Sequence, residues 1–135
     1  MSVNNVEIER AIDHLNRNYG RLTRAGFECG YGYRKGSFLL FMESDYDTIR
    51  EVMKEISMLY EKMKTPSRVC GTLHIKRHVQ NFRRQVDSIY KIRDPLYINH
   101  GCVIVALFLL GYGMKVHGTV CLVNIRMKPI EKILQ

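Results

Sequence analysis

The sequence lacks the features that mark several common classes of protein. It has no tryptophan and only three prolines, and those prolines separate periodic segments instead of forming a linker. Its longest apolar run covers residues 102–110, whereas a helix that crosses a bilayer needs about 20 residues. The first residues are polar and have a helical pattern, unlike a secretory signal. We therefore expect one globular intracellular domain over residues 1–135, with no membrane contact.

Cysteine is sparse, and each cysteine stands alone. No C-x-x-C pair is present, which favours reduced thiols over disulfides in an intracellular protein. Cys70, His74 and His78 do recur every four residues, a spacing that could hold a metal ion on one helical stripe. No carboxylate accompanies them, so we interpret the histidines as part of a basic surface. No metal or cofactor is expected.

Motifs for catalysis are also missing. The sequence has no glycine-rich phosphate loop followed by lysine, no G-x-S-x-G motif, and no pair of carboxylates in an apolar setting. His100 and Cys102 are close in the sequence, but their spacing does not bring the thiol to the ring on a helix. We therefore lean towards a protein that is not an enzyme.

The apolar pattern predicts an α+β fold. Helical spacing, or an apolar run of helical length, marks four segments: residues 4–22, 44–64, 72–93 and 99–110. Residues 27–42 and 114–126 instead have the composition of β-hairpins. The prediction is about four helices packed on a small antiparallel sheet made from these two hairpins.

Helix-start signals support two of these boundaries. Asn4 precedes Glu7 by three residues, a weaker form of the capping box. Ser44 and Asp47, also three residues apart, form a capping box that marks the clearest helix start in the chain. The helix over residues 72–93 should stop before Pro95, because the residue before a proline disfavours helical geometry.

Acidic residues are few, and their shortage is concentrated in one segment. The chain has 21 Lys and Arg residues against 13 Asp and Glu, a net charge of +8. Residues 65–94 hold seven basic and two acidic residues, so this segment alone accounts for most of the excess. The helix over residues 44–64 mixes both signs. A concentrated positive helix favours a polyanionic partner, and nucleic acid is the commonest one.

The predicted binding surface is the outer side of the basic helix. Its apolar residues recur every three or four positions from Ile75 to Ile89. This spacing should place Arg77, Arg84 and Lys91 on the side opposite the apolar one, with Lys76 and Arg83 between the two sides. The residues predicted to contact nucleic acid on this helix are Lys76, Arg77, Gln80, Arg83, Arg84 and Lys91. Their role would be phosphate neutralisation, which is largely blind to sequence.

A second set of candidate residues lies in the first hairpin. Tyr31, Tyr33, Arg34 and Lys35 could stack on bases and hold phosphates, as single-strand binders do. Tyrosines that pack a hairpin with a basic turn are the simpler interpretation.

The sequence therefore predicts a non-catalytic protein that binds DNA, RNA or a ribonucleoprotein. The alternative is a protein-interaction module, a small inhibitor or adaptor that docks on an acidic protein surface. A winged-helix arrangement fits poorly, because the helix before the second hairpin is the apolar segment 102–110 and not the basic one.

Overall fold

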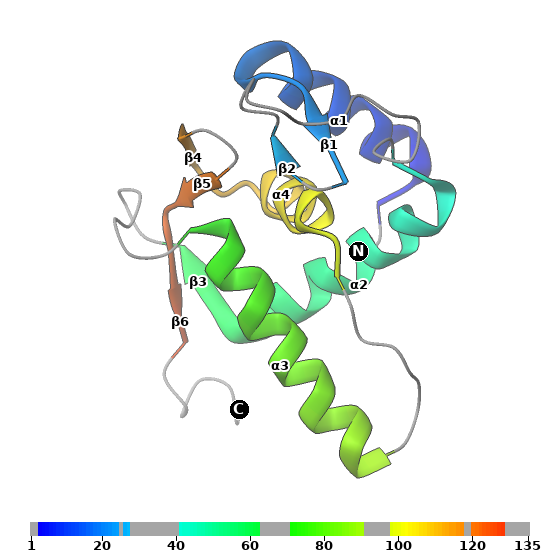
Figure 1. Cartoon of the computed structure of the whole chain (residues 1–135), viewed down its shortest axis with the longest axis vertical. Coiled ribbons are helices and arrows are strands. Elements are labelled where there is room, and N and C mark those ends of the chain that lie inside the picture. The colour runs from blue at the N-terminus through cyan, green and yellow to red at the C-terminus, as the bar shows by residue number, and fades with distance from the viewer. Residues whose placement is uncertain are drawn as a thin grey trace, which may run out of the picture.

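The computed structural model describes residues 3–24, 26–27, 41–62, 71–90, 98–117 and 120–128. Within them the chain forms four helices: α1 (Asn5–Tyr19), α2 (Glu43–Leu59), α3 (Thr72–Tyr90) and α4 (His100–Leu109). The strands are β1 (Leu22–Thr23), β2 (Gly26–Phe27), β3 (Tyr60–Lys62), β4 (Met114–His117), β5 (Val120–Val123) and β6 (Ile125–Met127). The predicted α+β class and its four helices are confirmed (Figure 1).

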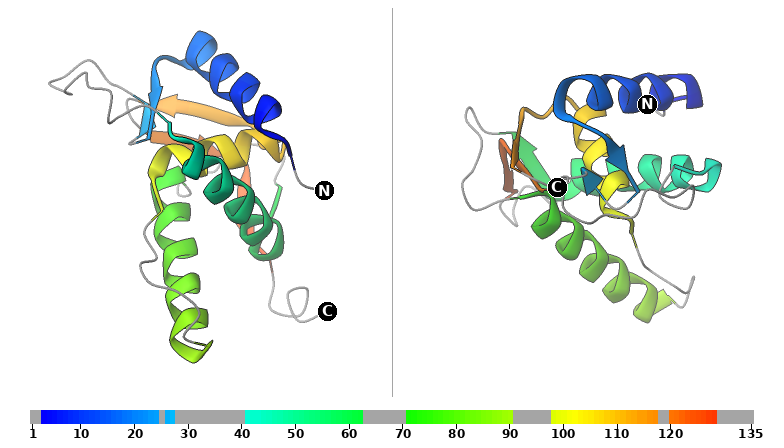
Figure 2. Two further views of the ribbon diagram at one scale, coloured as in Figure 1. Left: turned by 90° about the vertical axis from the view of Figure 1, so that its right-hand side faces the viewer. Right: turned by 45° about the horizontal axis from the view of Figure 1, so that its top comes forward.

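The short apolar helix α4 forms the centre of the core. Residues 102–107 are fully buried, as are Ile8 of α1, Ile56 of α2 and Ile75 of α3. A helix that is apolar on every side must be enclosed on every side. The other three helices accordingly pack around α4, with α1 and α3 on opposite sides of it (Figures 1 and 2).

The strands form three separate two-stranded antiparallel pieces within the described residues. The pairs are β1 with β2, β3 with β6, and β4 with β5. The hairpin predicted near residues 114–126 is confirmed as β4 and β5. The strands do not join into one sheet, because β6 turns away after Val123 and pairs with β3 at the end of α2. Most of the other predicted hairpin, residues 28–40, lies outside the described residues.

Helix α2 ends earlier than the sequence predicts. The apolar spacing continues to Met63, but the helix stops at Leu59 and β3 follows directly. Tyr60 pairs with Met127 and its side chain is almost fully buried. Pairing with a strand more than 60 residues away in sequence therefore overrides the local helical pattern.

The two predicted caps have different outcomes. Asn4 caps α1 as predicted, because its side chain accepts a hydrogen bond from the Glu7 backbone N–H at 2.9 Å. The prediction for α2 is wrong: the helix starts at Glu43, and Asp45, not Ser44, supplies the capping side chain. The Asp45 carboxylate accepts from the Met42 backbone N–H at 2.7 Å.

Candidate nucleic-acid interface

The orientation of α3 is fixed at its beginning. Ile75 and Val79 are fully buried, and the Thr72 hydroxyl lies 2.6 Å from Nε2 of His100 on α4. Gly71, just before the helix, forms a β-bridge with Leu122 of β5. Contacts to α4 and to β5 therefore hold the apolar side of the helix inward and leave its opposite side outward.

Five side chains form the outward side, which we call the α3 outer face. They are all exposed: His74, Arg77, Asn81, Arg84 and Gln85. Their spacing of three, four, three and one places them within one stripe of an α-helix. The predicted exposure of Arg77 and Arg84 is thus confirmed. Lys76 is only half-buried and lies on the flank of this stripe.

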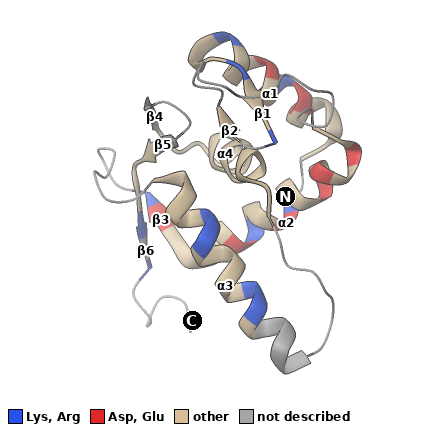
Figure 3. Ribbon diagram, viewed as in Figure 1, with Lys and Arg blue, Asp and Glu red and all other residues tan. Residues whose placement is uncertain are grey.

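The α3 outer face carries no acidic residue. Residues 72–85, whose side chains are described, contain four Lys or Arg residues and no Asp or Glu. Helices α1 and α2 show both signs of charge, whereas the described part of α3 shows only positive charge (Figure 3). With Arg77 and Arg84 exposed on one stripe, this surface can attract phosphate groups without an acidic neighbour among residues 72–85 to repel them.

The prediction that Arg83 contacts nucleic acid does not agree with its position in the structure. It is only 6% exposed, and its Nε donates to both carboxylate oxygens of Glu55 at 2.7 and 2.8 Å. Its Nη2 also donates to Glu51 at 3.3 Å. Both glutamates lie on α2. Arg83 is therefore neutralised inside the molecule and joins α2 to α3, so we leave it out of the candidate surface.

Gln80 also turns inward. It is 8% exposed, and its Oε1 accepts a hydrogen bond from the backbone N–H of Ile98 at 2.8 Å. This contact ties α3 to the segment that leads into α4. Gln80 therefore positions the chain and does not present its amide to a ligand.

The remaining predicted site residues lie outside the described residues. These are Lys91, Tyr31, Tyr33, Arg34 and Lys35.

The α3 outer face also contains one residue that the sequence prediction did not select. His74, Asn81 and Gln85 are exposed between or beside the two arginines. The sequence places His74 on the basic surface and adds Asn81, like Gln80, as a neutral donor, whereas Gln85 was not selected. A helical wheel drawn from the buried Ile75 and Val79 places Gln85 outward, so its signal was present in the sequence.

His78 lies away from this face. Its Nδ1 shares a hydrogen bond with the Tyr60 hydroxyl, and the two rings meet edge to face at 5.4 Å between centroids. Burial, together with the nearby His74 ring, lowers the pKa of His78. Among the described residues no three His, Cys, Asp or Glu side chains gather as they would around a metal ion.

A buried polar cluster joins the starts of α2 and α4 to the turn after β1. Asp45 is only 3% exposed. Its carboxylate accepts hydrogen bonds from Arg24 at 3.1 Å and from Asn99 at 3.3 Å. Cys102 lies beside it, and burial raises the pKa of this thiol to about 12. A thiol that stays protonated at neutral pH is a poor nucleophile, so we interpret the cluster as a structural joint.

Comparison with known proteins supplies no relative. The chain matches no protein-family model, no curated protein and no solved structure at a significant level. Within the part of the chain that is described, no helix is both long enough and apolar enough to cross a membrane.

Proposed function

We propose that this protein binds nucleic acid, without catalysis, through the α3 outer face. The observation that carries the proposal is the exposed stripe on which Arg77 and Arg84 stand without an acidic residue. Several exposed cations on one rigid element are what phosphate recognition requires, and the forked guanidinium of arginine suits it well.

One cation of the basic helix is not available to a ligand, which limits the size of the site. Arg83 is buried and forms ion pairs with Glu55 and Glu51. Within residues 72–85, about two or three phosphate contacts come from Arg77 and Arg84 of the outer face and from Lys76 on its flank. Each contact contributes roughly 0.9 to the slope of log affinity against log salt concentration. We therefore expect a slope of roughly −2 to −3.

The test is fluorescence anisotropy with labelled duplex and single-stranded oligonucleotides over a series of salt concentrations. The double variant Arg77→Ala/Arg84→Ala should bind much more weakly, and its salt slope should be smaller by roughly 2. Both side chains are exposed, so circular dichroism should show an unchanged fold.

A matched control is available on α1. Arg10→Ala/Arg17→Ala removes two exposed arginines from another helix and changes the net charge by the same amount. If the proposal holds, this variant keeps most of the affinity and the salt slope. Equal losses in both double variants would show that net charge, and not the α3 outer face, causes the binding.

Absence of binding to every oligonucleotide at low salt would overturn the proposal. Capture of an acidic folded protein by the wild type, lost in Arg77→Ala/Arg84→Ala, would then favour the protein-interaction module.

A further inference from the structure

The shape of α3 suits a groove in a double helix. At 1.5 Å per residue its 19 residues extend over about 28 Å. Its first half packs on α4 and β5, and its second half runs away from α4 (Figures 1 and 2). The major groove of B-form DNA is wide enough to admit an α-helix, whereas the deep, narrow major groove of double-stranded RNA is not.

The chemistry of the outer face suits base edges as well as phosphates. Asn81 lies between Arg77 and Arg84, four residues after the first and three before the second, and all three side chains are exposed. An asparagine amide can donate to and accept from one adenine. An arginine guanidinium can only donate, either to O6 and N7 of guanine or to phosphate oxygens. From Arg77 to Arg84 the stripe rises by about 10 Å along the helix, comparable to three stacked base pairs.

The same face is poorly suited to single strands. Binding of single-stranded nucleic acid relies on aromatic side chains on which bases stack. Among residues 72–85 the only Phe, Tyr or Trp is Phe82, which is half-buried against the core. The α3 outer face therefore offers a single small ring for stacking, the imidazole of His74.

From these observations we infer that the ligand of the α3 outer face is duplex DNA. Helix α3 lies in the major groove, where Arg77 and Arg84 contact phosphates and Asn81 contacts a base edge. This inference rests on the proposed function, and it adds the kind of nucleic acid and a side chain that reads sequence.

The first experiment compares duplex DNA, duplex RNA of the same sequence and single-stranded DNA at one salt concentration. Duplex DNA should bind most tightly. Dimethyl sulfate, which methylates guanine N7 in the major groove, should react less at bound guanines. Equal or tighter binding of duplex RNA or single strands, or unchanged methylation, would overturn the inference while leaving the proposed function in place.

The second experiment selects duplexes from a random pool, using the wild type. We expect an enriched sequence. Asn81→Ala should bind that sequence roughly 5- to 100-fold more weakly, while its affinity for random duplex and its salt slope stay unchanged. Asn18→Ala, which removes an exposed asparagine from α1, is the matched control and should keep the preference.

The results separate this inference from the proposed function. If no nucleic acid binds at all, both fail. If duplex DNA binds through Arg77 and Arg84 but no sequence is enriched, or Asn81→Ala keeps the full preference, only the base-reading role is wrong.

Discussion

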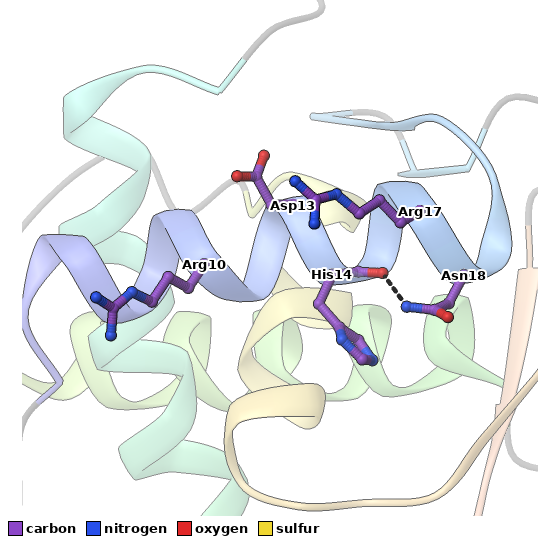
Figure 4. A pocket seen from close by; sticks show the side chains of 5 residues that line it. All are labelled: Arg10, Asp13, His14, Arg17 and Asn18. Atoms are coloured by element: carbon purple, nitrogen blue, oxygen red, sulfur yellow. Dashed lines mark hydrogen bonds between the residues drawn. The ribbon is translucent and has the colours of Figure 1, made fainter.

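Helices α1 and α3 are similar in packing but differ in the charges on their exposed sides. Both pack an apolar side on α4, and both expose arginines on the other side. On α1, however, Arg10 and Arg17 share their surface with Asp13, and these residues line an open depression together with His14 and Asn18 (Figure 4). The guanidinium of Arg17 extends along the helix towards Asp13 (Figure 4). Among residues 72–85 of α3 no acidic residue accompanies Arg77 and Arg84.

Because of this difference, the number of arginines on a helix does not by itself indicate how strongly that helix attracts an anion. Oppositely charged side chains three or four residues apart on a helix screen one another. The arginines of α1 meet this condition through Asp13. Arg77 of the α3 outer face does not, because no acid stands three or four residues from it. Asp87 stands three residues after Arg84, beyond the part of α3 whose side chains are described. The acids of α2 contact Arg83, about 100° around the helix axis from Arg84.

The largest expected effect on stability concerns the contact between α4 and the turn after β1, next to α1. The Gly101 N–H donates to the Arg24 carbonyl at 2.8 Å, which fixes α4 against the turn after β1. A Cβ atom at Gly101 would lie 2.1 Å from the backbone oxygen of Thr23. Gly101→Ala should therefore lower the free energy of unfolding by at least about 3 kcal/mol, the upper end for overpacking. Urea unfolding measures it.

Gly113→Ala is the control for that substitution. There the added Cβ would meet Asn124 at 3.6 Å, an ordinary contact. We expect a change within about 0.5 kcal/mol. Equal stability of the two variants would show that the close approach of α4 to the turn is not as described.

Substitution of two adjacent arginines on α3 should change the free energy of unfolding by very different amounts. Arg83→Ala removes the buried partner of Glu55, whose side chain is itself only 13% exposed. Leaving one member of a buried ion pair alone should cost about 3 kcal/mol. Arg84→Ala should change stability by less than about 0.5 kcal/mol. Thermal or urea unfolding of the two variants makes the comparison. If the Arg83→Ala protein is as stable as the wild type but binds nucleic acid weakly, Arg83 is a ligand-binding residue and not a structural one.

This pair of arginines also shows what could be predicted from the sequence. The periodicity of Ile75 and Val79 located α3 and its inward side, because local spacing determines which side chains share a stripe. The fate of Arg83 depended on Glu55, which is 28 residues earlier in the chain. The early end of α2 depended in the same way on β6. Contacts between distant segments leave no local pattern, so these features could not be predicted.

A smaller effect concerns pH and the inner flank of α3. Burial lowers the pKa of His78, so the unfolded chain binds a proton there more readily than the folded protein does. Stability should therefore fall as pH drops below the ordinary histidine value of about 6.5 and should level off below the lowered pKa. His78→Gln should remove this part of the pH dependence. A full difference curve of unfolding free energy against pH, wild type minus variant, tests it. A flat difference curve would contradict the lowered pKa.

The smallest effect is expected from a substitution that removes an acid from the exposed side of α1, so that its charge resembles that of α3. Asp13→Asn, made in the Arg77→Ala/Arg84→Ala background, removes the acid between Arg10 and Arg17. Residual affinity for duplex DNA at low salt should rise by roughly twofold, since an exposed charge interaction is worth less than about 1 kcal/mol. Glu43→Gln removes one exposed acid from α2 and serves as the control. If both variants gain equally in anisotropy titrations, net charge determines the gain. A larger gain for Asp13→Asn would instead show that the acid on its own helix face is what separates α1 from α3.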